Sequence, residues 1–367
     1  MTAAGTMQHD TAGSATPLTR RTRTWHTYLT GQYDNLGDAL LRRAMVDALA
    51  GVGPLHVYVG AAPADYVAAL RLPASSHVYR SRLRWIAATA AHMVRPGRSV
   101  FLGNPGEISS SRTELALGTV SAALMTLGRL SGNPGYRTGV GARDRRRPWS
   151  LGHEWAHRVA TRRVWRDDVS RAMYGDGIVA PDWAFALAPH DARAPRDLVV
   201  LSYRGDMPRP TATALSTVRD WSRSRHLELV VISMVGRDVD ENERTAAELG
   251  IRHIHAQNGG LEEAERVTRD AFARAQIVLS NRIHVLIVGA VDGATPGAVL
   301  AHSDLKAART MRGANVPFSS VSAGATPAEL VAYLDDLSDG DDAVARAVQA
   351  AAQRVKRLGA SLRDGPT

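Results

Sequence analysis

The chain has 367 residues, 44% of them hydrophobic and 22% charged, and this length predicts two domains that each bury a core. It contains no cysteine, which excludes disulfides and thiolate metal sites and favours a cytoplasmic location. No apolar run approaches the roughly 20 residues that a membrane span needs. Residues 1–17 are small and polar, unlike a signal peptide, and we expect residues 1–22 to be a disordered lead-in.

The net charge of +9 comes almost entirely from arginine, since Lys306 and Lys356 are the only lysines. One interpretation is that arginine forks bind anionic ligands; the other is that a GC-rich genome replaces lysine with arginine throughout. Three clusters could bring the protein to the inner face of an anionic membrane or to a lipid-linked phosphate: Arg20, Arg21 and Arg23; Arg80, Arg82 and Arg84; and Arg145, Arg146 and Arg147. No nucleic-acid-binding motif is present, so nucleic acid is not an expected partner.

Residues 23–187 are expected to form the first domain. Short β-branched runs alternate there with longer amphipathic runs, a pattern typical of βα units around a parallel sheet. The predicted strands are 25–29, 55–59, 99–103 and 163–166, and the predicted helices are 37–49, 62–70, 84–93 and 113–127.

A linker is expected at residues 188–195, after which the alternation restarts in a second domain, 196–336. The predicted strands are 198–203, 227–234, 275–280 and 316–321, and the predicted helices are 211–224, 242–249, one from about 282, and 327–337. Residues 337–367 are expected to be a C-terminal helix, 342–358, and a tail. Two such domains suggest facing Rossmann-like halves whose ligands sit at the carboxyl ends of the strands.

The strongest local motif is Ser280-Asn281-Arg282-Ile283-His284, which follows an apolar strand and opens a helix. A helix N-terminus favours an anion, Arg282 adds a bidentate charge, and His284 can supply a proton near neutral pH. The alternative is that His284 only packs in the helix while Arg282 pairs with a surface carboxylate.

Two weaker signals accompany it. The loop Asp34-Asn35-Leu36-Gly37-Asp38 joins the first strand to the first helix, and Gly37 permits a tight turn there. Asn35 or Asp38 either caps the helix or binds sugar hydroxyls in the cleft. Arg204 ends a strand of the second domain and either faces the cleft or is an exposed surface residue.

Together, and in this order, the three motifs resemble the polysaccharide pyruvyl transferase family. Intermediate segments are also similar: Arg166 to Ser170 resembles an Arg-Asp-x-x-Ser segment, Pro181 to Phe185 a Pro-Asp-x-Ala-Phe segment, and Gly293 to Pro296 a Gly-x-Pro turn. The resemblance covers about residues 27–321. The chain departs from it at residues 102–107, Leu-Gly-Asn-Pro-Gly-Glu, where the family often has a glycine triplet in a loop that faces the cleft.

The resemblance implies a GT-B-like fold whose last helix packs back toward the first domain. It also implies transfer of a pyruvyl group from phosphoenolpyruvate to a sugar of a cell-envelope polysaccharide or a lipid-linked glycan, with no cofactor and no metal. His284 would be the general acid, and Arg282 and Arg204 would hold the donor. The other implied substrate-binding residues are Ser280, Asn281, Asn35, Gly37 and Asp38.

Two further motifs suggest metals. His153-Glu154-Trp155-Ala156-His157 fits the His-Glu-x-x-His pattern of zinc proteases, but a two-domain βα chain is the wrong setting, and a plain helix before the strand at Val164 is preferred. Asp238-Val239-Asp240 matches the Asp-x-Asp of some glycosyltransferases, but it is read as a helix start with Asp240 as the cap.

Three functions therefore remain open. The first is pyruvyl transfer, the second is glycosyl transfer from a nucleotide sugar on the same fold, and the third is non-catalytic binding of an anionic polymer through arginine.

Overall fold

The computed structural model describes residues 22–190, 195–256, 260–301 and 305–364. The expected lead-in, except for its last residue, and the middle of the expected linker lie outside these described residues. No helix in the described part of the chain is both long and apolar enough to cross a membrane.

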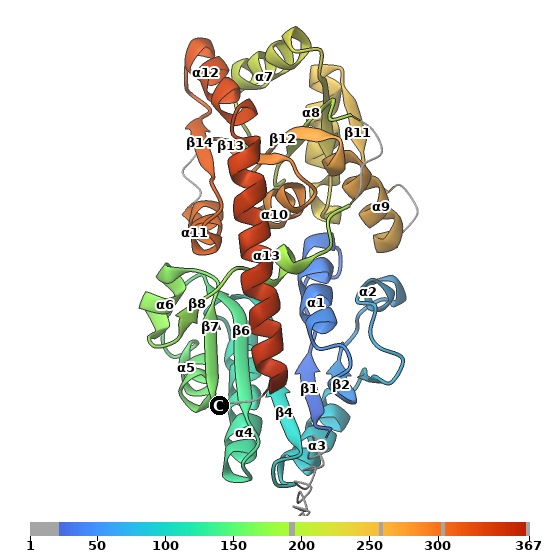
Figure 1. Cartoon of the computed structure of the whole chain (residues 1–367), viewed down its shortest axis with the longest axis vertical. Coiled ribbons are helices and arrows are strands. Elements are labelled where there is room, and N and C mark those ends of the chain that lie inside the picture. Colours follow the sequence, from blue (N-terminus) through green and yellow to red (C-terminus); the bar gives the residue numbers. More distant parts are fainter. Residues whose placement is uncertain (1–21, 191–194, 257–259, 302–304, 365–367) are drawn as a thin grey trace, which may run out of the picture.

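The first domain is built on an eight-stranded parallel sheet with the order β3-β2-β1-β4-β6-β7-β8, and β5 pairs with β6. Figure 1 shows β2, β1, β4, β6 and β7 side by side in this order. Its strands are β1 Thr24–Tyr28, β2 Leu55–Tyr58, β3 His77–Tyr79, β4 Ser99–Leu102, β5 Gly106–Ile108, β6 Gly135–Ala142, β7 Arg162–Trp165 and β8 Ile178–Val179. Its helices are α1 Leu36–Ala48, α2 Ala64–Ala69, α3 Arg82–Met93, α4 Arg112–Leu130, α5 Leu151–Val159, α6 Asp168–Tyr174 and the short 3-10 helix η1 Trp183–Ala186.

The second domain has a six-stranded parallel sheet with the order β11-β10-β9-β12-β13-β14. Its strands are β9 Leu198–Ser202, β10 Glu228–Ile232, β11 Arg252–Ile254, β12 Ala275–Ser280, β13 Thr295–Leu300 and β14 Ser319–Ser322. Its helices are α7 Ala212–Ser224, the 3-10 helix η2 Gly236–Asp238, α8 Val239–Leu249, α9 Gly260–Ala273, α10 Ile283–Val291, α11 Leu305–Ala314 and α12 Pro327–Ser338. The two facing Rossmann-like domains expected from the sequence are confirmed.

Each sheet has a point at which the strand order reverses direction. β1 lies between β2 and β4 in the first sheet, and β9 lies between β10 and β12 in the second. Connections on the two sides of such a strand leave on opposite faces of the sheet, so a crevice opens at its carboxyl end. The loops that follow β1, β4, β9 and β12 therefore define where a ligand should bind.

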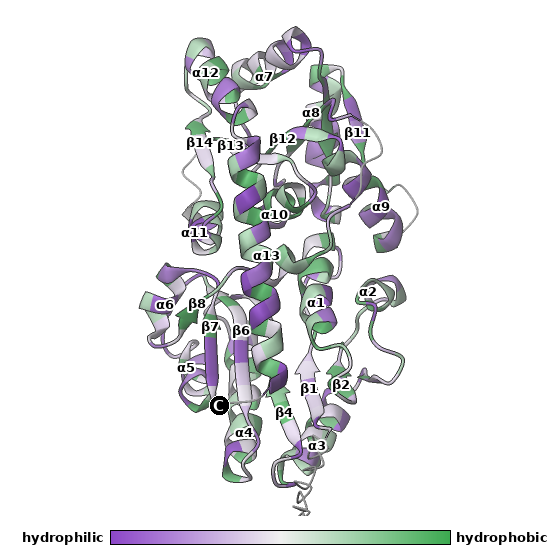
Figure 2. Ribbon diagram, viewed as in Figure 1, coloured by the Kyte–Doolittle hydropathy of each residue, from purple (hydrophilic) through white to green (hydrophobic). Residues whose placement is uncertain are grey.

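The long helix α13, Asp341–Asp364, runs beside both domains (Figure 1). Polar and apolar residues alternate along it (Figure 2), and one helical stripe is buried, comprising Val344, Val348, Ala351, Val355, Leu358 and Leu362. This stripe belongs to one continuous apolar core with Leu40 of the first domain and Leu286 of the second. The expected packing of the last helix toward the first domain is confirmed, and the shared core joins the two domains behind the cleft.

Candidate active site between the domains

A cleft of about 650 Å³ lies between the domains, where the two reversal points face each other. Six of the eight site residues predicted from the sequence line it: Asn35, Asp38, Arg204, Asn281, Arg282 and His284. The loop after β4 also lines it, from Asn104 to Ser109, as the sequence indicated. Ser280 and Gly37 do not line the cleft: Ser280 is fully buried, and Gly37 packs against His284.

His284 lies in the first turn of α10, between two carboxylates of the first domain. Its Nδ1 is 3.9 Å from Oδ1 of Asp38, and its Nε2 is 3.9 Å from Oδ2 of the fully buried Asp182. Burial opposes ionisation of both carboxyls, but the charges of Arg42 and His284 outweigh it for Asp38, and those of His284 and Arg166 outweigh it for Asp182. The pKa of each carboxyl is therefore lowered. Both carboxylates can balance the charge of a protonated His284.

The loop before α1 joins the two domains through its backbone. The amide of Leu36 donates to the carbonyl of Met234 at 3.0 Å, and the amide of Gly236 donates to the carbonyl of Asp34 at 2.9 Å. Asn35 caps α1 by accepting from the amide of Asp38 at 3.4 Å, so the capping interpretation is confirmed while its side chain still lines the cleft. These contacts hold Asp38 opposite His284.

Arg282 and Arg204 reach the cleft, but each is already paired with a carboxylate. Arg282 donates to both oxygens of the buried Asp238, at 2.6 and 2.5 Å, and Arg204 donates to both oxygens of Asp206, at 2.8 and 2.6 Å. Asn281 accepts from the backbone amide of Arg204 at 2.9 Å and so links the loops after β9 and β12.

Ser280 is fully buried and acts within the protein. Its hydroxyl donates to the carbonyl of Ser202 at 2.6 Å and accepts from the amide of Arg282 at 2.9 Å. The side chain thus shapes the turn that presents Arg282 and His284, without facing the cleft.

A basic cluster surrounds Glu107 on the other side of the cleft. Its carboxylate lies 2.7 Å from Arg143, 3.3 Å from Lys306, 3.3 Å from Arg166 and 3.5 Å from Arg309. Burial opposes ionisation of Glu107, but Lys306, Arg166 and Arg143 outweigh it and lower its pKa to about 2. Three of these cations, Arg143, Arg166 and Lys306, line the cleft, where they form a basic surface for an anionic ligand. Asp167 and Asp182 also lie close to Arg166.

Several polar atoms on or beside His284 and Arg166, which line the cleft, are buried without a hydrogen-bond partner among the described residues. They are Nε2 of His284, Oδ2 of Asp182, Oδ2 of Asp167, and Nε of Arg166 and Arg309. Ion-pair distances of 3.6 to 3.9 Å connect neighbouring members of this set. Eleven other buried atoms among the described residues also lack a partner, but none of them belongs to a carboxylate or a guanidinium. The gathering of such charged groups here marks the floor of the cleft as its chemical centre.

Sequence reasoning did not name Arg166 and Asp182 of this centre as site residues, nor Lys306 of the basic cluster around Glu107. Arg166 and Asp182 belong to segments that were noted only as family resemblance. Lys306 was not singled out, although it is one of two lysines in a chain with 45 basic residues. A lysine retained where arginine otherwise dominates was a signal that could have found it.

Neither candidate metal motif from the sequence forms a metal site. Nε2 of His153 lies 2.7 Å from Glu114, whereas the ring of His157 packs on Trp165 with centroids 4.8 Å apart. The carboxylate of Glu154 accepts hydrogen bonds from Arg145, Ser150 and Arg147. These bonds, that from Arg145 most of all, lower the pKa of Glu154 to about 2. The preferred interpretation, a plain helix before β7, therefore agrees with the structure.

The proposed cap at Asp240 is wrong. α8 begins at Val239, so Asp240 lies inside its first turn and Asp238 occupies the cap position without a side-chain capping bond. Asp238 is instead the partner of Arg282, because the chain turns through η2 immediately before α8 and brings this carboxylate beside the loop after β12.

Comparison with known proteins places the fold. No protein-family model and no curated protein matches the sequence. Among solved structures, one described as a UDP-N-acetylglucosamine 2-epimerase from Listeria monocytogenes superposes with a TM-score of 0.59 at 11% identity, over 93% of this chain and 96% of that one. The UDP-GlcNAc 2-epimerase from Neisseria meningitidis bound to UDP-GlcNAc gives 0.57 at 7% identity, over 91% and 98%. Anabaena HepE in complex with UDP-glucose gives 0.57 at 12% identity, over 93% and 100%. This chain has a GT-B-like fold.

Proposed function

We propose that the protein is a transferase that moves a pyruvyl group from phosphoenolpyruvate to two hydroxyls of a sugar in a cell-envelope glycan or its lipid-linked precursor. The observation that carries the proposal is the set of unsatisfied buried polar atoms around His284, Asp182 and Arg166 at the floor of the cleft. The motif order described above supports the choice of donor.

The charge distribution suits a small donor that carries two anionic groups. Arg204, Arg237 and Arg282 are each paired with an aspartate, whereas Lys306, Arg166 and Arg143 converge on the single carboxylate of Glu107. We place the phosphate of the donor at this second cluster, and its carboxylate toward Arg282 and Arg204. This refines the expectation that Arg282 and Arg204 alone hold the donor.

In the proposed reaction His284 protonates the methylene carbon of the enol, and the adjacent carbon becomes electrophilic. A sugar hydroxyl adds to that carbon and passes its proton to a carboxylate, for which Asp38 is placed on the wall of the cleft. A second hydroxyl of the same sugar then adds to the same carbon as the bond between that carbon and the phosphate oxygen breaks, which closes the cyclic ketal. Its proton passes to the departing phosphate, and the proton held by Asp38 restores His284. The basic cluster stabilises the departing phosphate electrostatically.

Glycosyl transfer from a nucleotide sugar is the second candidate, and the comparisons favour it. The solved structures that share the fold include proteins described with UDP-glucose and UDP-GlcNAc. Against it, Tyr28 is the only phenylalanine, tyrosine or tryptophan among the described residues that line the cleft, and it belongs to the first domain. The wall from the second domain thus offers charge for a compact anion rather than an aromatic surface for a base.

Calorimetric titration distinguishes the two donors. Phosphoenolpyruvate, UDP-glucose and UDP-GlcNAc are titrated separately, with and without a diol sugar, into the wild type, Arg282→Ala and the surface control Arg266→Ala. Binding of phosphoenolpyruvate that is lost only in Arg282→Ala supports pyruvyl transfer. Binding of a nucleotide sugar with no response to phosphoenolpyruvate, in either condition, would assign the chain to the second candidate.

A further inference from the structure

A row of histidines crosses the first sheet away from the cleft. His26 pairs in register with His56, and His56 pairs in register with His77, on the adjacent parallel strands β1, β2 and β3. Side chains at matched positions of neighbouring strands point to the same face of a sheet. Helix α3 covers this face and adds His92 from its last turn. None of the four lines the cleft.

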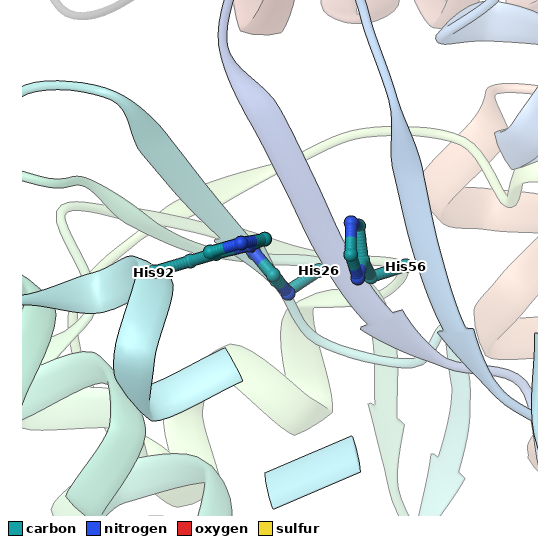
Figure 3. A group of neighbouring side chains, drawn as sticks. All are labelled: His26, His56 and His92. Carbon is teal, nitrogen blue, oxygen red and sulfur yellow. The ribbon is translucent and has the colours of Figure 1, made fainter. Parts of the chain in front are cut away.

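Three of these histidines converge (Figure 3). His26, His56 and His92 each offer one nitrogen, and these nitrogens lie within 4.8 Å of one another. Nε2 of His26 is 3.1 Å from Nδ1 of His92. Zinc binds histidine nitrogens at about 2.0–2.1 Å in a tetrahedron, which places ligand nitrogens roughly 3.3 Å apart. One pair already has about this spacing, and the widest pair must approach by about 1.5 Å.

Hydroxyl groups orient two of the rings. Nδ1 of His26 lies 3.2 Å from the hydroxyl of the buried Thr89, and Nδ1 of His56 lies 2.8 Å from the hydroxyl of Tyr79. A metal-binding histidine commonly uses its second ring nitrogen in such a bond, which fixes the tautomer. The Nε2 atoms of both rings are left as ligands.

The ligand atoms available here are all imidazole nitrogens, which favours one class of metal. Neutral imidazole suits zinc and similar transition metals, whereas magnesium and calcium prefer oxygen.

We propose that His26, His56 and His92 form a zinc site that ties α3 to strands β1 and β2. Its fourth ligand is a water or the exposed His77, whose ring centroid lies 4.5 Å from that of His56. The site is structural and separate from the cleft, so the proposal does not depend on the function assigned above.

Zinc binding by the full chain, produced without a histidine tag and stripped with a chelator, tests the proposal. Zinc is titrated calorimetrically into the wild type, His92→Gln and the control His226→Asn. The control histidine is exposed, lies in the second domain and has a φ of 58° that asparagine tolerates. We expect the wild type to bind one equivalent of zinc, and the affinity for zinc to fall at least about tenfold in His92→Gln only. At a zinc concentration a hundredfold above Kd, the melting temperature of the wild type should rise by roughly 5 °C.

A second measurement covers the case in which the variant does not fold. Cobalt(II) added to the wild type should give the intense visible absorption of a tetrahedral site and lose it on addition of zinc. Absence of stoichiometric zinc binding, equal affinity in wild type and folded His92→Gln, or only the weak spectrum of octahedral cobalt would each overturn the proposal.

Discussion

Gly37 of the first domain lies directly against His284 of the second. A Cβ built on Gly37 would come within 3.0 Å of Cβ, Cγ and Nδ1 of His284, closer than real side chains approach. The sequence suggested that Gly37 serves a tight turn, but the structure places it in the first turn of α1, where its missing side chain makes room for the histidine. This contact sets how near His284 lies to Asp38.

Replacement of Gly37 by alanine should therefore displace His284. We expect turnover, followed as phosphate release from phosphoenolpyruvate with a diol sugar, to fall at least about tenfold, and the free energy of unfolding to fall by about 1–3 kcal/mol. Gly324→Ala is the matched control, since its Cβ would meet only Ser322 at 3.5 Å. Unchanged turnover in a folded Gly37→Ala protein would contradict the close packing.

His284→Ala should abolish turnover and leave the affinity for phosphoenolpyruvate nearly intact. The imidazole is proposed to donate a proton, an effect of about 10²–10⁴ in rate, while the charges that hold the donor belong to Arg166, Lys306 and Arg282. Comparison of kcat with the calorimetric Kd measures the two effects separately. Equal losses in both quantities would count against the general-acid role.

The two lysines of the chain make a matched pair of variants. Lys306 lines the cleft near Glu107, whereas Lys356 is exposed on α13. We expect Lys306→Met to weaken phosphoenolpyruvate binding by about 10–100-fold, the usual effect of losing a charged partner, and Lys356→Met to leave it unchanged. Calorimetry at two salt concentrations checks this, because loss of a cation should also flatten the salt dependence. Equal affinities in the two variants would remove Lys306 from the site.

Glu107 should make stability depend on pH. Its pKa is lowered to about 2 from an ordinary value of 4.5, so its charge stabilises the fold above pH 4.5, and this stabilisation is lost as the pH falls toward 2. We expect the free energy of unfolding of Glu107→Gln to be about 2–3 kcal/mol lower than that of the wild type at pH 7. The difference should shrink by more than half at pH 3.

Urea denaturation at several pH values measures this difference. Glu243→Gln, at an exposed position of α8, serves as the control and should track the wild type throughout. A gap between Glu107→Gln and wild type that stays constant from pH 7 to pH 3 would show that the lost stabilisation does not come from the carboxylate charge.

The strands that the sequence predicted and those it missed differ in composition. Strands β4, β9 and β12 are mostly apolar runs, and β1, Thr-Trp-His-Thr-Tyr, is made largely of β-branched and aromatic residues. All four were predicted within a few residues. β6, Gly135–Ala142, was not predicted, although all eight of its residues are buried in the middle of the first sheet. Its glycines lower strand propensity, but they leave room for neighbours, since a Cβ on Gly139 would collide with Trp183 and one on Gly141 with Arg166.

By itself, the sequence determined the two βα domains, the C-terminal helix and the loop ends that line the cleft, because hydrophobic periodicity and turn residues act over short stretches of chain. The return of that helix toward the first domain was implied only by the family resemblance. The tertiary structure alone decided which charges meet: Asp182 faces His284, Asp238 pairs with Arg282, and Lys306 stands beside Glu107. It also brought His26, His56 and His92 together from two strands and a helix. Such pairings depend on strand order and domain packing, which join residues far apart in the chain and leave no local pattern to read.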